Sequence, residues 1–429
     1  MKLHCAVRRL SLTRNIKWLV RLILLLMRRI IALSKARNYF GKEKVYLFLP
    51  INGAGLGHLN RCLSVASALK KQEPDAEIIF LTTSIALPIV HRFGFPCHHV
   101  TPAALAGKEV ATYEWNQLFA NTIVEVMSIY RPRVLVFDGS YPYAGLQKVI
   151  TSYKSKLSLI WIKRELYKSS VDTGRLGEQL RLFDSVISPA EISVAAERLP
   201  NSSQSSNENH LYHVSPIYLL EPYEILTRTE ARETLDLEPS TKSAFVQLGA
   251  GNINDIKGMQ DIVVAVLRDI GFKVVVARSP ISLGEVSSVT GAHRVIVDFP
   301  TSRLMNAFDL AVVAGGYNSV CESVIYDVPT VFIPNLSTGS DDQLIRVESV
   351  ARLGRFEVLA DFDRYEFLAL VHRMTYKTQQ GIQEQNSIQF KNGADEAARI
   401  IRMLRIPRPS GLGPSVFTKS KSRKNASSD

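Results

Sequence analysis

The stretch GAGLGH is the first place where residue types and spacing suggest chemistry. Gly53, Gly55 and Gly57 stand at alternate positions after an apolar run, and His58 follows them directly. Glycine lets a ligand or another backbone approach closely, and the N-terminus of the helix expected next favours an anion. A histidine there could deprotonate a hydroxyl, cap the turn or bind a phosphate. The stretch predicts a ligand-facing loop with a candidate general base; a purely structural tight turn is the alternative.

Two common nucleotide-binding patterns do not fit this stretch. Its G-x-G-x-G spacing differs from the dinucleotide fingerprint, and the next apolar run, EIIFLTTS, ends without the acidic residue that would hold a ribose. No lysine follows the glycines as in a P-loop. NAD and ATP are therefore disfavoured as ligands of this loop.

Charged residues end two further apolar runs. Asp138 ends VLVFD and could orient His58 or bind an acceptor, with a loop cap or a solvated carboxylate as the alternative. Lys163 and Arg164 follow LSLIWI and could stabilise a diphosphate or an anionic acceptor, or form a surface salt bridge. Ligands of parallel sheets bind beyond the carboxyl ends of the strands. We therefore predict Asp138 as a second catalytic residue and Arg164 as a substrate-binding residue.

The strongest signal lies in residues 311–354. An apolar strand ends there, Gly315 and Gly316 turn the chain, and Asn318 and Ser319 can cap the helix that follows. The free backbone N–H groups at the start of such a helix form a natural diphosphate site. We expect these four residues to contact the substrate.

Polar residues farther along the same stretch complete a candidate nucleotide-sugar site. Glu322 lies one helical turn after Asn318, where its carboxylate can accept both hydroxyls of a ribose. Asp342 and Gln343, in the polar loop TVFIPNLSTGSDDQ, could bind sugar hydroxyls. Neither the scattered cysteines nor the adjacent acids Asp341 and Asp342 match a metal-site spacing, so we expect no metal and no cofactor.

These residues need parallel strands to bring them together, and the sequence supplies the pattern. Short, continuously apolar runs alternate with helix-period stretches, as in α/β proteins whose strands are buried on both faces. The alternation pauses at the polar loop LPNSSQSSNEN. We predict two doubly wound, Rossmann-like domains, residues 41–218 and 225–405, with a cleft between them.

The basic residues are concentrated at the two ends of the chain. The formal net charge is +12, but residues 1–44 contain twelve Lys and Arg against one acid, and residues 398–429 contain eight against one. The remaining body is mildly acidic, which disfavours nucleic acid as a partner. Basic ends favour an anionic membrane surface.

Residues 1–40 form a basic amphipathic segment whose longest charge-free apolar run is too short to span a bilayer. We expect an interfacial helix, with a signal sequence or a helix packed on the body as alternatives. Residues 406–429 are expected to be a disordered basic tail. Scattered cysteines fit a reducing cytosol, so a cytoplasmic protein on the inner face of the membrane is predicted.

Residues 311–354 resemble the donor-binding region of family 28 glycosyltransferases, the group that contains the peptidoglycan N-acetylglucosaminyltransferase. The resemblance rests on Gly315-Gly316, the helix with Glu322, and Asp342-Gln343, although Asp342 replaces the family's histidine. It implies the two-domain GT-B fold, a nucleotide-sugar donor, usually UDP-linked, and Glu322 on the ribose.

Two looser matches extend the resemblance over most of residues 45–405. VQLGAGNIND resembles the family's glycine loop, which implies that Gly249, Gly251 and Asn252 contact substrate, and GAGLGHLNR resembles its acceptor-side loop. We therefore predict an inverting glycosyltransferase that acts on a sugar or lipid-linked acceptor, with His58 as base. The alternatives are a nucleotide-sugar hydrolase or epimerase, and a non-catalytic nucleotide-sugar-binding subunit.

Overall fold

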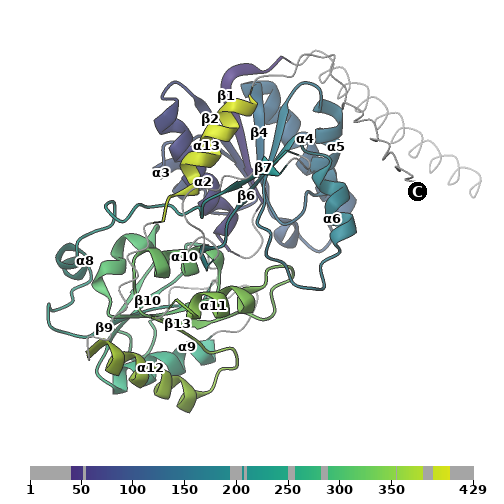
Figure 1. Cartoon of the computed structure of the whole chain (residues 1–429). Helices are drawn as coiled ribbons and strands as arrows, with labels where there is room; N and C mark the ends of the chain where they lie inside the picture. The colour runs from purple at the N-terminus through teal and green to yellow at the C-terminus, as the bar shows by residue number, and fades with distance from the viewer. Residues whose placement is uncertain are drawn as a thin grey trace, which may run out of the picture.

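Two parallel sheets, each covered by helices, form two domains in the computed structural model (Figure 1). The structure describes residues 40–51, 55–193, 205–206, 210–249, 257–281, 288–353, 355–379 and 390–405. The expected interfacial helix and the expected disordered tail lie outside the described residues. Within the described ranges, no helix is both long enough and apolar enough to cross a membrane.

The first sheet has eight strands in the described part, in the order β3-β2-β1-β4-β5-β6-β8-β7. Neighbouring strands are parallel, except that the two-residue β7 pairs antiparallel with β8. The strands are β1 (Lys42–Pro50), β2 (Glu77–Thr82), β3 (Cys97–His99), β4 (Pro132–Asp138), β5 (Ser158–Ile162), β6 (Ser185–Pro189), β7 (Ser205–Ser206) and β8 (Leu211–Val214). The helices of this region are α2 (Gly57–Gln72), α3 (Leu87–Arg92), the 3-10 helix η1 (Ala103–Leu105), α4 (Thr112–Tyr130), α5 (Ala144–Tyr153) and α6 (Thr173–Leu180).

The second sheet has six described strands, all parallel, in the order β11-β10-β9-β12-β13-β14. The strands are β9 (Ser243–Gln247), β10 (Lys273–Ala277), β11 (Arg294–Ile296), β12 (Leu310–Ala314), β13 (Thr330–Ile333) and β14 (Phe356–Val358). The helices in this part of the sequence are α8 (Arg228–Thr234), α9 (Lys257–Asp269), the 3-10 helix η2 (Thr301–Ala307), α10 (Tyr317–Ile325), α11 (Gln343–Ala351), α12 (Arg364–Gln379) and α13 (Gly393–Leu404), of which α13 packs on the first domain.

The continuously apolar strands are buried on both faces. In β1, Tyr46 and Phe48 belong to one hydrophobic core, whereas Leu47 and Leu49 belong to the core on the opposite face of the sheet. Successive side chains of a strand point to opposite faces, so a strand covered by helices on both sides has no polar alternation. The predicted α/β architecture is therefore confirmed.

The last described helix does not pack where the expected second domain, 225–405, would place it. Helix α13 crosses back and packs on the first domain, where Ala397, Ala398 and Ile401 join the same core as Leu59 of α2 (Figure 1). Gly393 makes the approach possible, because a Cβ there would lie 1.9 Å from the Ser215 carbonyl oxygen. The sequence did not reveal this, since the apolar face of α13 would suit either domain.

Candidate active site

The carboxyl ends of the two sheets meet at a domain junction. The loop after β5 forms an antiparallel bridge with the loop after β13, through Tyr167 and Asp341. Lys168 extends the contact: its backbone N–H donates to the Ser340 carbonyl (3.0 Å), and its Nζ donates to the Leu336 carbonyl (2.6 Å). Loops that follow strands of both domains therefore form one connected site.

His58 and Asp138 come together on the first-domain side of this junction. His58 is the second residue of α2, and Asp138 is the last residue of β4. The His58 Nδ1 atom lies 2.6 Å from Asp138 Oδ1, and the Asp138 side chain is fully buried. The structure thus shows the pairing that the sequence suggested, with the carboxylate behind the imidazole.

Arg61, which sequence reasoning missed, completes this group. It lies one turn after His58 on α2, and its Nε and Nη2 donate to the two oxygens of Asp138 at 3.0 and 2.6 Å. Residues three apart on a helix share a face, so the H-L-N-R spacing was the available signal. The Asp138 carboxylate is therefore held from two directions.

The electrostatics favour an ionised Asp138 and a neutral His58. Burial alone would raise the pKa of Asp138, but Arg61 and His58 outweigh it and hold that pKa below its ordinary value. Burial is the main influence on His58 and lowers its pKa, although Asp138 opposes the shift. An ionised carboxylate only accepts hydrogen bonds, so Nδ1 carries the proton and Nε2 keeps a free lone pair.

The described glycines before His58 are required neither by packing nor by backbone conformation. A Cβ on Gly55 or Gly57 would meet no atom within 4 Å, and neither residue has a positive φ. Gly53 lies outside the described residues. The two glycines therefore leave space at the junction, and their contact with a substrate stays a prediction.

On the second-domain side, Gly315 and Gly316 behave differently. A Cβ on Gly315 would lie 2.9 Å from Val347 and 3.2 Å from the Gln343 carbonyl oxygen, so glycine is required for α11 to approach the turn. A Cβ on Gly316 would meet nothing within 4 Å. Gly316 is the N-cap of α10, so its open side exposes the start of that helix.

The expected capping of α10 by Asn318 and Ser319 is wrong. The helix begins at Tyr317, two residues earlier than a cap at Asn318 would place it, and its N-cap, Gly316, makes no side-chain hydrogen bond. Asn318 and Ser319 are therefore inside the first turn. The backbone N–H groups of that turn keep the capacity to bind an anion.

Glu322 lies farther along α10 without a pairing cation among the described residues. Burial raises its pKa to about 7, and the hydroxyl of Ser302 in η2 only partly offsets the rise. A half-buried carboxylate without a pairing cation gains from further hydroxyl donors. This environment is compatible with the expected ribose contact.

Asp342 and Gln343 have structural partners that the sequence did not predict. Asp342 is the N-cap of α11, where its Oδ1 accepts from the Ile345 N–H at 3.1 Å. The Gln343 side-chain carbonyl accepts from the Asn335 N–H at 2.9 Å. Both residues therefore shape the loop between β13 and α11, and a sugar contact for them stays a prediction.

Comparisons with known proteins agree with this architecture. No protein-family model matches the chain. The UDP-N-acetylglucosamine--N-acetylmuramyl-(pentapeptide) pyrophosphoryl-undecaprenol N-acetylglucosamine transferase of Phocaeicola vulgatus is 22% identical over 335 residues, which cover 70% of this chain and 80% of that protein. Solved structures of Acinetobacter baumannii MurG (13% identity, TM-score 0.52) and of the kitacinnamycin glycotransferase (15% identity, TM-score 0.55) each cover 84% of this chain, and 99% and 98% of their own.

The fold is GT-B. The expected resemblance to a family 28 enzyme is confirmed by the similarity to the Phocaeicola vulgatus transferase. The similar proteins are glycosyltransferases, in agreement with the predicted enzyme class.

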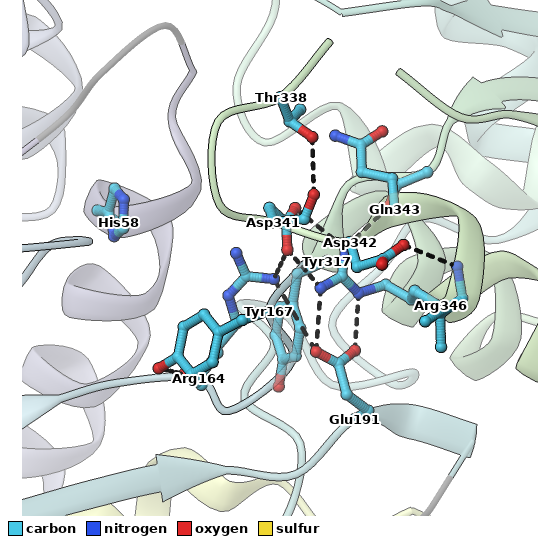
Figure 2. Close-up of polar contacts among 12 residues, drawn as sticks. His58, Arg164, Tyr167, Glu191, Tyr317, Thr338, Asp341, Asp342, Gln343 and Arg346 are labelled. Atoms are coloured by element: carbon cyan, nitrogen blue, oxygen red, sulfur yellow. Dashed lines mark hydrogen bonds and ion pairs between the residues drawn. The ribbon is translucent and has the colours of Figure 1, made fainter. Parts of the chain in front are cut away.

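A buried arginine cluster joins the two GT-B domains, and sequence reasoning missed it. Arg346 of α11 donates to Glu191 of the first domain (2.7 and 3.0 Å), to Asp341 (2.6 and 3.1 Å) and to the Gly315 carbonyl (3.1 Å) (Figure 2). Its side chain is 1% exposed. No local pattern indicated this cluster, since its members come from separate loops and helices.

The expected diphosphate contact of Arg164 competes with fixed partners. Arg164 Nη1 lies 3.0 Å from Asp341 and 4.0 Å from Glu191, and the guanidinium packs over the Tyr317 ring at 5.2 Å. Figure 2 shows Arg164 within this cluster, whereas His58 lies apart on α2. Arg164 therefore joins the GT-B domains, and substrate binding by it stays a prediction.

Lys163, the other cation expected at this strand end, is buried in an aromatic surrounding. Its Nζ donates to the Ser140 carbonyl at 2.9 Å, and burial lowers its pKa to about 7. The Nζ atom lies over three rings: Trp161 at 4.6 Å, Tyr167 at 4.6 Å and Tyr141 at 5.4 Å. The Ser140 carbonyl and the three rings therefore hold Lys163 in place beside the site.

The glycine loop after β9 is described only in part. Gly249 has a φ of 105°, a conformation that favours glycine, so its backbone explains the residue. Gly251 and Asn252 lie outside the described residues. Within the described ranges, no group of three or more His, Cys, Asp or Glu is placed to hold a metal ion.

Proposed function

We propose that this chain is an inverting glycosyltransferase that moves a sugar from a nucleotide sugar, UDP-linked, to an acceptor hydroxyl. One observation carries the proposal: His58 Nδ1 is held 2.6 Å from the buried Asp138 carboxylate at the junction of two GT-B domains. This arrangement fixes the tautomer and leaves Nε2 as the basic atom. Base and donor helix α10 belong to different domains, so substrates bound to each side can react at the junction.

The reaction is a single displacement. His58 Nε2 takes the proton of the acceptor hydroxyl while that oxygen forms a bond to the anomeric carbon of the donor. The bond from the anomeric carbon to the diphosphate breaks, and its electron pair stays on the diphosphate. Asp138 stabilises the imidazolium that results. Attack opposite the leaving group inverts the anomeric configuration.

The second domain supplies the donor site. The N-terminus of α10, open at Gly316, offers backbone N–H groups to the developing charge of the diphosphate. Glu322 accepts the ribose hydroxyls from the same helix. The name of the Phocaeicola vulgatus relative includes UDP-N-acetylglucosamine, which supports a UDP sugar as the donor here.

The acceptor is a sugar or a lipid-linked molecule at the first-domain side. The relative's name includes a pyrophosphoryl-undecaprenol acceptor, which supports the lipid-linked choice. We further propose that the basic residues of 1–40 hold the protein on the inner face of the cytoplasmic membrane. The abundance of Lys and Arg in this segment supports attraction to anionic lipid.

The test is His58→Ala, assayed on one preparation for sugar transfer, UDP affinity and melting temperature. Loss of a general base lowers turnover by roughly 10²–10⁴-fold. UDP affinity and melting temperature stay close to the unmodified protein, since the base touches the acceptor and not the nucleotide. Turnover within a few-fold of the unmodified protein would exclude His58 as the base.

The products separate this proposal from its rivals. Free sugar released at the same rate with and without an acceptor would instead indicate a hydrolase, in which His58 activates water. Nucleotide-sugar binding without turnover for any acceptor would indicate a binding subunit.

A further inference from the structure

Arg61 is arranged to fix the plane of the Asp138 carboxylate. Its guanidinium makes two parallel hydrogen bonds to the carboxylate, at 3.0 and 2.6 Å, and the residue is only 2% exposed. Such two-pronged pairs add geometric specificity as well as strength. The same Nη2 atom lies 3.0 Å from His58 Nδ1. Arg61 therefore contacts both partners of the dyad.

The outer side of Arg61 meets the donor domain. Its guanidinium carbon lies 5.7 Å from the centre of the Tyr317 ring, within cation–π range. Tyr317 is the first residue of α10 and is 4% exposed. Its hydroxyl donates to the Ala190 carbonyl and accepts from the Ile217 N–H, both at 3.0 Å. Tyr317 is thus anchored to backbone that follows β6 and β8 of the first sheet.

We propose that Arg61 is the positioning residue of the His58–Asp138 base, and that Tyr317 holds Arg61 in place only while the donor domain is seated against the acceptor domain. The inference rests on the proposed function. It adds that the base is assembled by the same contact that brings the donor helix to the acceptor side.

Arg61 also influences the charge of the imidazole. The charged groups facing His58 are Asp138, which favours the imidazolium, and Arg61 and Arg164, which oppose it. Lys163 acts on Arg61 and Asp138 from the end of β5, and Tyr317 and Cys62 are the other titratable neighbours of Arg61. Removing Arg61 takes away a repelling cation and frees Asp138 for His58, so the pKa of His58 should rise.

The experiment compares Arg61→Met and Arg61→Lys in the full-length protein labelled with ¹⁵N-histidine. The His58 signals are identified by their loss in His58→Ala, and their ¹⁵N shifts report which ring nitrogen carries the proton. In Arg61→Met we expect the His58 pKa to rise by roughly one unit, and the acid limb of kcat/KM to move with it. Arg61→Lys keeps the positive charge but loses the paired hydrogen bonds to Asp138. It should therefore retain the low pKa of His58 and leave UDP affinity unchanged, yet lower kcat by roughly tenfold or more.

Tyr317 is tested by a matched pair. Tyr317→Phe loses the hydroxyl anchor but retains the ring over Arg61, so the Nδ1–H signal of His58 should persist, whereas Tyr317→Leu should broaden it and lower kcat roughly tenfold relative to Tyr317→Phe. Equal behaviour of the two variants would overturn the role of the ring. An unchanged His58 pKa and tautomer in Arg61→Met would overturn the role of Arg61.

These outcomes are separable from failure of the proposed function. The NMR signals report on Arg61, His58 and Tyr317 even if no sugar is transferred to any acceptor. Should Arg61→Met not fold, Arg61→Lys and the Tyr317 pair still decide the inference through kcat and the Nδ1–H signal.

Discussion

Burial favours the uncharged forms of two residues of the site, and it shifts their pKa values in opposite directions. It lowers the pKa of His58, which stays a neutral base to lower pH, and it raises the pKa of Glu322 to about 7. A ribose hydroxyl needs an acceptor, and only the ionised carboxylate offers its full accepting capacity. Donor binding should therefore fail at a higher pH than the base does.

We predict that UDP affinity falls as pH drops through about 7, the pKa of Glu322 in the folded protein. Below that pH the carboxyl is protonated and loses its charged hydrogen bonds to the ribose, worth roughly 1.5–3 kcal/mol. Calorimetric titration of UDP at pH values from about one unit below to about one unit above that pKa, roughly pH 6 to pH 8, measures the effect.

Glu322→Gln is the matched control for this prediction. The amide does not titrate, so the variant should bind UDP weakly at every pH, and any remaining pH dependence belongs to the nucleotide. Identical affinity profiles for the variant and the unmodified protein would remove Glu322 from the donor site.

The start of α10 shows how one element combines packing with access to ligand. Gly315 and Gly316 are adjacent, yet only Gly315 is enclosed by neighbouring atoms. Helix α11 needs the first glycine in order to approach, and nothing in the described structure needs the second. The open position is therefore available for a ligand that approaches the helix N-terminus.

The two glycines give a paired prediction. Gly316→Ala should leave the melting temperature nearly unchanged and weaken UDP binding, because the added methyl group projects into the space for the diphosphate. Gly315→Ala should lower the free energy of unfolding by roughly 1–3 kcal/mol through overpacking against Val347 and the Gln343 backbone. Thermal melts and UDP titrations of both variants check this, and loss of stability in Gly316→Ala with normal UDP affinity would contradict it.

Much of the fold was predictable from the sequence, because each buried parallel strand corresponds to a short, continuously apolar run of residues. The runs at β1, β4 and β12 are continuously apolar, and polar residues at their carboxyl ends marked His58 and Asp138 as neighbours. The arginine cluster could not be predicted from any local sequence pattern. Arg346 and Glu191 are 155 positions apart and meet only through the packing of the two domains. Asn318 was expected as a cap because its residue type favours one, but the helix begins at Tyr317 with Gly316 as its N-cap.

For the whole molecule, the return of α13 means that the first domain contains both the beginning and the end of the described chain. The second domain is joined to it by two chain crossings, one after β8 and one before α13 (Figure 1). Two crossings restrict relative domain motion more than one linker would. The contacts of Arg346 and Lys168 at the junction add to that restriction.

Membrane attachment is tested on the whole chain. Full-length protein should sediment with anionic vesicles, and a 41–429 variant should sediment less, because each cation near the surface adds on the order of 1 kcal/mol. High salt should release the full-length protein, since screening weakens these attractions. Equal sedimentation of the two proteins would show that residues 1–40 are not the anchor.

Glu73 marks the point where both ends of the described chain converge. Arg405, just after α13, lies 2.6 Å from Glu73, and Lys44, near the start of β1, lies 3.8 Å from it. The described chain therefore begins and ends at one pole of the first domain, so two basic terminal segments that both bound anionic lipid, as proposed for residues 1–40, would form a bivalent tether in which binding by one raises the effective concentration of the other. His58 stands at the other end of α2 from Glu73, about 22 Å away for fifteen residues of helix. A molecule held at that pole alone, with α2 perpendicular to the membrane, would meet acceptors well above the lipid surface. A molecule lying flat on the membrane would meet them at the level of the headgroups.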